Sequence, residues 1–186
     1  NNSIRQQLVF RYGTNNNNLL FKSPVGSLSN DGNWHHYMIT YDGGTTGSSS
    51  GSINDYYSRF KMFIDGVERA TRNNSSTLAS SSYKFNVGGA VWDAGGNHVK
   101  QKFDDVRVWN VAKTQAELQA GMNSELAGNE AGLIGYWRFD EGAAGGDNTA
   151  LPASIEDSSP NDNAGTLIAS AQSGSSSNWL EGKIQQ

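Results

Sequence analysis

The sequence of 186 residues contains no cysteine, and only 17% of its residues are charged. Without cysteine the chain has no disulfide framework, no cysteine-ligated zinc site and no thiol nucleophile. A net charge of −4 provides no basic surface for nucleic acid or for an anionic membrane. No apolar run approaches the roughly 20 residues of a membrane-spanning helix. We therefore expect neither a nucleic-acid partner nor a membrane span.

The chain is rich in small polar residues, including 22 glycines, and it also contains five Trp, seven Tyr and seven Phe. Small polar tracts occur both in disordered chains and in the turns of all-β domains. The aromatic residues favour the second interpretation, because disordered chains contain few of them. The composition therefore predicts a folded all-β domain whose small polar residues lie in loops and turns.

Alternation of apolar and polar residues predicts strands in several segments. Residues 60–65 alternate in this way, and Asp65-Gly66 predicts a type I′ hairpin turn leading to a strand at 67–71, since this pair readily adopts two positive φ angles. The other predicted strands are 7–11, 19–22, 36–41, 83–87, 103–109 and 133–139.

One helix is predicted, at residues 114–123. It begins with a capping box, in which the Thr114 hydroxyl can accept from the amide of Glu117 and the Glu117 side chain can reach back. One short helix among eight or so strands predicts a β-sandwich. Long exposed loops are predicted where the sequence is low in complexity, at 43–53, 73–82 and 170–178.

Five sequence blocks, in order, resemble segments of laminin-G-like domains, which belong to the concanavalin A-like jelly rolls. The clearest is D-G-N-W-H-H-Y-M-I-T-Y-D-G-G at 31–44, which resembles DGxWHHVAxTYDG. The other blocks are 62–67, 85–89, 103–110 with the AEL helix at 116–118, and 132–142 followed by 157–167. The resemblance implies an all-β, concanavalin A-like β-sandwich (jelly roll) with one short helix near 114–123. It also implies an extracellular or cell-surface location.

The order of these blocks departs from the family in one respect. The portion at 132–142 and 157–167 commonly opens a domain in the family, whereas here it comes last. We therefore expect residues 1–129 to form the body of the sandwich and 169–186 to form a polar tail. Residues 130–168 then either complete the sandwich or open a following domain.

Oxygen-bearing side chains are dense in one short segment that contains Asp157, Asn161, Asp162 and Asn163. Ca²⁺ takes about six to eight oxygen ligands and tolerates irregular loops. Asp140 or Glu141, from the end of the preceding strand, and Asp105 are further candidate ligands. The alternative is that these side chains form turns that stabilise their own backbone. Because the resemblance implies that calcium is common in this fold, we expect a Ca²⁺ site here.

A second candidate site lies in a glycine-rich segment that contains Trp92, Asp93, Asn97 and His98. An aromatic ring can stack on the C–H face of a sugar while Asp and Asn side chains bind its hydroxyl groups, and function tends to lie on loops. The alternative is that Trp92 folds back over the edge of the sheet, since Trp is usually well buried.

The sequence offers no catalytic pattern: it lacks an E-x-D-x-x-E strand, and its serine residues are predicted to lie in turns, so none forms the strand-to-helix nucleophile elbow of a hydrolase. His35 and His36 are adjacent, so in extended chain their side chains point to opposite faces and cannot both bind one metal ion. We therefore expect structural, hydrogen-bonded roles for them. The sequence predicts a non-catalytic, calcium-dependent module that binds a glycan or a cell-surface protein. It would stand beside neighbouring domains of the same adhesin-like, extracellular chain. A structural spacer without a ligand and, less favoured, a glycoside hydrolase of the concanavalin A-like fold are the alternatives.

Overall fold

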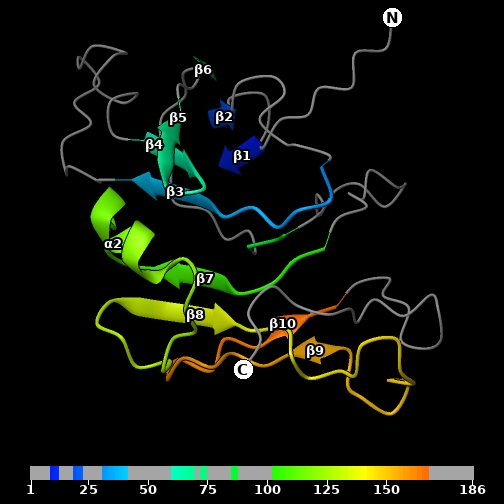
Figure 1. Cartoon of the computed structure of the whole chain (residues 1–186). Coiled ribbons are helices and arrows are strands. Elements are labelled where there is room, and N and C mark those ends of the chain that lie inside the picture. The colour runs from blue at the N-terminus through cyan, green and yellow to red at the C-terminus, as the bar shows by residue number, and fades with distance from the viewer. Residues whose placement is uncertain are drawn as a thin grey trace, which may run out of the picture. The chain divides into compact units, whose positions relative to one another are not determined.

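The computed structural model describes residues 9–12, 19–22, 31–41, 60–69, 72–74, 85–87 and 102–167. Within these residues the chain consists of short strands and one helix (Figure 1). No helix in the described part is long and apolar enough to cross a membrane. The segment predicted to bind a ligand, with Trp92, Asp93, Asn97 and His98, lies outside the described residues.

The chain forms two compact units, each of two segments. One consists of Asn1–Tyr83 and Ala112–Met122, and the other of Lys84–Val111 and Asn123–Gln186. The division that the sequence suggests, at residues 129 and 130, stays a prediction.

Among its described residues, the first unit forms two three-stranded antiparallel sheets. One has the order β1-β2-β6, with β1 at Val9–Tyr12, β2 at Leu19–Lys22 and β6 at Arg72–Asn74. The other has the order β3-β4-β5, with β3 at Tyr37–Tyr41, β4 at Phe60–Ile64 and β5 at Val67–Arg69.

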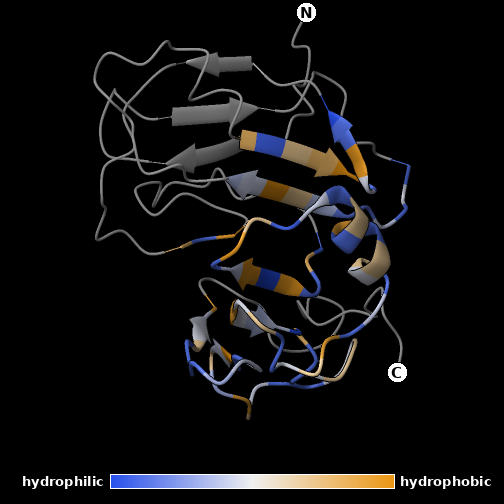
Figure 2. Ribbon diagram, turned by 90° about the vertical axis from the view of Figure 1, so that its left-hand side faces the viewer, coloured by the Kyte–Doolittle hydropathy of each residue, from blue (hydrophilic) through white to orange (hydrophobic). Residues whose placement is uncertain are grey.

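β4 is the central strand of its sheet and carries most of the described core of this unit. Four of its five residues are buried and only Lys61 is exposed. Figure 2 shows the strand as largely hydrophobic, as expected of a strand with neighbours on both sides. The turn from β4 to β5 confirms the predicted hairpin, because Asp65 and Gly66 both have positive φ, at 52° and 74°.

The helix α2 runs over Gln115–Gly121, inside the predicted 114–123. The predicted capping box is present: the amide of Glu117 donates to the Thr114 hydroxyl at 3.2 Å, and the amide of Thr114 donates to the Glu117 carboxylate at 2.8 Å. Leu118 is the buried residue of the helix.

The described residues of the second unit form two antiparallel pairs of strands. β7 (Val106–Trp109) pairs with β8 (Leu133–Trp137), and β9 (Ser154–Ile155) pairs with β10 (Gly165–Thr166). Among the described residues of this unit, the buried hydrophobic side chains are those of Leu133, Tyr136 and Ile155.

The strands β7 and β8 are shorter than the sequence predicts because left-handed residues stop them at the same end. Val106 pairs with Trp137, and just beyond this pair Asp105 and Phe139 have positive φ, at 57° and 61°. A residue with left-handed backbone angles cannot continue the inter-strand hydrogen bonding of a β-sheet. The strand predicted at 83–87 is wrong over its described residues 85–87, which belong to no strand and are exposed.

Candidate functional site

The carboxylate of Asp157 is the centre of the loop that the sequence assigns to calcium. Its Oδ1 accepts the amides of Tyr136 at 2.8 Å and Ser159 at 2.9 Å. Its Oδ2 accepts the Ser159 hydroxyl at 2.9 Å and the amide of Asn163 at 2.8 Å. A carboxylate has about four acceptor positions. All of them are therefore used by donors of the chain itself.

The amide side chains of the same loop bind the backbone of β8. Asn163 Nδ2 donates to the carbonyl of Ile134 at 2.9 Å, and Asn161 Nδ2 donates to that of Leu133 at 3.4 Å. The amide of Ser158 donates to the carbonyl of Tyr136 at 2.7 Å. The loop thus forms hydrogen bonds with backbone N–H and C=O groups of β8 that a further strand could otherwise pair with. It protects these groups without adding a strand to the sheet.

These bonds set the charge state of Asp157. Burial alone raises the pKa of this carboxyl, but the donors from Tyr136, Ser159 and Asn163 together outweigh burial and hold the pKa below its ordinary value. The carboxylate is therefore a fixed anion that organises its own loop. This is the turn-forming alternative raised by the sequence, on a larger scale.

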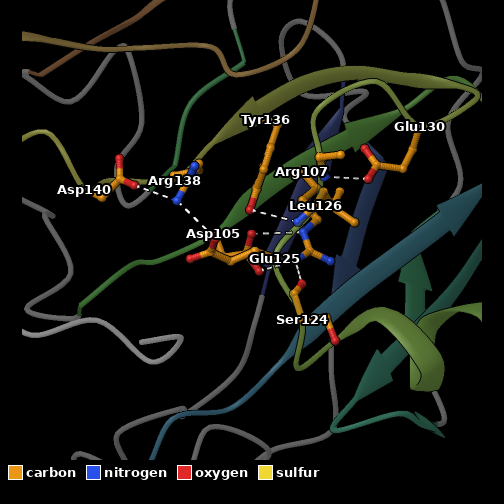
Figure 3. Close-up of polar contacts among 10 residues, drawn as sticks. Asp105, Arg107, Ser124, Glu125, Leu126, Glu130, Tyr136, Arg138 and Asp140 are labelled. Carbon is orange, nitrogen blue, oxygen red and sulfur yellow. Dashed lines mark hydrogen bonds and ion pairs between the residues drawn. The ribbon is translucent and has the colours of Figure 1, made fainter. Parts of the chain in front are cut away.

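Asp105, a second predicted calcium ligand, faces an arginine. Arg107 donates from Nε to Oδ1 at 3.0 Å and from Nη2 to Oδ2 at 2.5 Å, a two-pronged ion pair. The pair is mostly buried, with 11% of the Arg107 side chain and 14% of the Asp105 side chain exposed. Arg107 also donates to the carbonyl of Ser124 and lies 5.5 Å from the centre of the Tyr136 ring (Figure 3).

Asp140, the third predicted acidic ligand, is also paired with an arginine. Arg138 lies 3.0 Å from Asp140 and 3.1 Å from Glu125, so one guanidinium joins two carboxylates (Figure 3). Across the described part of the chain, no group of three or more acidic, histidine or cysteine side chains is placed to hold a metal. Asp105, Asp140 and Asp157 are therefore not brought together as a ligand set. Calcium binding itself stays a prediction.

Glu141 differs from these acids because burial dominates its ionisation. Desolvation raises the pKa of its carboxyl above the ordinary value, and the amide of Glu156, which donates to Oε1 at 2.7 Å, only partly offsets this. Its Oε2 is buried and has no hydrogen-bond partner within the described structure. Through this bond Glu141, four residues after the end of β8, holds the backbone at Glu156.

In the first unit, His35 lies between two carboxylates. Its Nδ1 is 2.7 Å from Asp65 Oδ2, and its Nε2 is 3.2 Å from Asp31 Oδ1. The bond to Asp65, followed by that to Asp31, raises the pKa of the imidazole above 6.5. Asp65 Oδ1 also accepts the amide of His36 at 2.9 Å. The histidine thus connects two turns, in agreement with the structural role expected from the sequence.

Phe85 and Trp137 form an aromatic pair in the second unit. Their ring centres are 6.3 Å apart, the planes are 29° from parallel, and Phe85 is 60% exposed. The indole Nε1 of Trp137 donates to the carbonyl of Asn163 at 2.9 Å. Sequence reasoning missed this pair because it placed both residues in strands, and nothing in local periodicity indicates a contact across 52 positions.

Residues 2–119 match the family model described as the Concanavalin A-like lectin/glucanases superfamily. The match covers more than half of the chain, and the protein belongs to this superfamily. No curated protein and no solved structure matches the sequence. Membership confirms the laminin-G-like resemblance and the all-β sandwich class. The matched residues end before β8 and the Asp157 loop.

Proposed function

We propose that this chain is a non-catalytic module that binds carbohydrate, as part of an extracellular protein. The observation that carries the proposal is the commitment of Asp157, Asp105, Asp140 and His35 to contacts that hold the backbone or neutralise charge. Within the described residues, these four side chains therefore hold loops in place. Within a superfamily of lectins and glucanases, this favours the lectin-like role.

A glycoside hydrolase needs two carboxyl groups on either side of the scissile bond, one of them protonated. Glu141, with its raised pKa, has one property of such an acid. Its Oε1, however, accepts the amide of Glu156, which gives the side chain a structural partner. Glu141 is therefore assigned to structure in this proposal.

The test combines binding and turnover on the same polysaccharides. We expect the full chain to be slowed in native gels that contain a neutral polysaccharide and to release no new reducing ends from it. Release of reducing ends that is lost in Glu141→Gln would replace the proposal with hydrolysis. Capture by a cell-surface protein without any polysaccharide binding would favour a protein ligand, and no binding of either kind would favour a spacer.

Calcium dependence and the adhesin-like setting are part of the same proposal and rest on the sequence resemblance. An ion that binds only the folded chain raises its apparent stability. We therefore expect Ca²⁺, added after EDTA, to raise the melting temperature. Because all acceptor positions of Asp157 are filled, this rise should persist in Asp157→Asn. An equal melting temperature in Ca²⁺ and in EDTA would count against calcium.

A further inference from the structure

Phe85 is the most exposed of the large hydrophobic side chains in the described part of the chain, at 60%. Val87, two positions on, is 42% exposed. Full burial of such side chains stabilises a fold by about 1.5–3 kcal/mol each. Phe85 forgoes most of this stabilisation in the chain itself, so it remains available to a ligand.

The ring beneath Phe85 is fixed in position. The Nε1–H of Trp137 is bonded to the carbonyl of Asn163, and the six-membered part of the indole lies over Gly135. A Cβ at position 135 would come within 2.5 Å of Cη2 of this ring, so only glycine leaves room for it. Gly165 lies beside the other edge of the indole, 3.6 Å from Cδ1 when measured from a Cβ placed on it. Trp137 is therefore a rigid support, and Phe85 stacks on it from outside.

A polar side chain lies in the segment that holds the indole. Asn163 is exposed; its Nδ2 donates to the carbonyl of Ile134, and its Oδ1 can accept from another group. An aromatic face attracts the weakly positive C–H groups of a pyranose ring, and a nearby amide oxygen can accept from one of its hydroxyls. The chain carries a net charge of −4, which disfavours a sulfated or carboxylated polymer.

We propose that Phe85, supported by Trp137, is a stacking platform for a pyranose unit of a neutral polysaccharide. The proposal rests on the function proposed above and assigns that function to residues outside the segment at 92–98. Trp137 is a positioning residue, because it acts through Phe85.

The experiment compares the full chain with Phe85→Ala, Phe85→Tyr and Tyr41→Ala in native gels containing mixed-linkage β-glucan, galactomannan, arabinoxylan or, as the charged counterpart, alginate. Tyr41 is the matched control, since it is also exposed, at 37%, and also stacks on an aromatic neighbour, Phe60, with ring centres 4.6 Å apart. Melting curves and near-ultraviolet circular dichroism establish that each variant is folded.

We expect a neutral polysaccharide to slow the wild type, with affinity about tenfold or more lower in Phe85→Ala and kept in Phe85→Tyr and Tyr41→Ala. Wild-type binding that Phe85→Ala leaves unchanged overturns the platform and leaves the proposed function standing. An equal loss of affinity in Tyr41→Ala also overturns the platform and leaves the proposed function standing. Binding to alginate alone overturns the choice of a neutral ligand. Absence of binding to all four polymers refutes the proposed function and the platform with it.

Discussion

The backbone amide of Tyr136 donates a 2.8 Å hydrogen bond to the carboxylate of Asp157, which lies 21 positions further along the chain. This bond joins the buried middle of β8 to the loop at 157–163. The same carboxylate accepts three more hydrogen bonds from the loop itself. One side chain therefore holds the loop together and attaches it to β8.

Replacement of Asp157 by asparagine should therefore weaken the fold. The amide NH₂ would face backbone N–H groups, and a buried donor left without an acceptor costs about 1–3 kcal/mol. We expect the free energy of unfolding in urea, followed by tryptophan fluorescence, to fall by roughly 2 kcal/mol. Asp162→Asn is the matched control, since Asp162 is exposed and its left-handed φ of 54° suits asparagine equally well. An equal effect in both variants would contradict the role assigned to Asp157.

The same carboxylate makes stability depend on acid. The folded-state pKa of Asp157 lies below the ordinary 3.8, so its contribution is present above that value and is lost as the pH falls through the folded-state pKa. The urea midpoint of the wild type should drop in this range, and the drop should be smaller in Asp157→Asn. A parallel pH dependence of the two proteins would show that other carboxyls account for the acid sensitivity.

Glu141 contributes a pH dependence of stability with the opposite sign to that of Asp157. Burial raises the pKa of its carboxyl above 4.5, so ionisation destabilises the folded chain as the pH rises from that value through the folded-state pKa. Glu141→Gln keeps an oxygen for the amide of Glu156 and removes the charge. We expect a higher melting temperature than the wild type at neutral pH and little difference below pH 4.5. A lower melting temperature at neutral pH would mean that the charge is stabilising.

The His35 bridge should weaken in base. Its folded-state pKa is raised above 6.5, so its stabilisation is complete below 6.5 and is lost as the pH rises through the raised value. An NMR titration of the imidazole should give a pKa above 6.5 in the wild type and a value closer to 6.5 in Asp31→Asn, which removes one of the two carboxylates. No change in Asp31→Asn would show that Asp65 alone raises the pKa.

Gly66 should tolerate alanine less well than Gly32. Both have positive φ, at 74° and 81°, which costs a residue with a Cβ about 1–2 kcal/mol. A Cβ on Gly66 would also lie 2.9 Å from Cγ of Gln119, whose Nε2 donates to the carbonyl of Gly66 at 2.8 Å, whereas a Cβ on Gly32 meets nothing within 4 Å. We expect Gly66→Ala to cost roughly 1 kcal/mol more than Gly32→Ala in urea unfolding. Equal losses would mean that Gln119 moves aside freely.

Local patterns predicted most of the described elements because each depends on neighbours in the sequence. The Asp65-Gly66 turn and the Thr114 capping box are properties of two to four consecutive residues, and both are present as predicted. The limits of β7 and β8 were not predictable, since the left-handed backbone at Asp105 and Phe139 breaks a favourable alternation.

The candidate calcium loop shows where local reasoning ends. Oxygen-rich side chains at 157–163 have the same composition whether they bind an ion or a strand. The outcome depends on which groups the side chains meet once the chain is folded. Ser159 and Asn163, in the loop itself, supply three of the four donors to Asp157, and distant Tyr136 supplies the fourth. The carbonyl of Ile134, also distant, engages the side chain of Asn163. Similarly, Asp105 and Asp140 are candidate ligands until Arg107 and Arg138 are placed beside them.

The sequence by itself determined the all-β class, the family, the hairpin and the helix that follows Thr114, because composition, periodicity and turn chemistry act over short stretches of chain. Only the tertiary structure decided that Asp157 holds β8 and that Phe85 is exposed on a fixed Trp137. Hydrogen-bond partners and solvent exposure depend on which distant segments of the chain come together, and local sequence patterns do not determine those contacts.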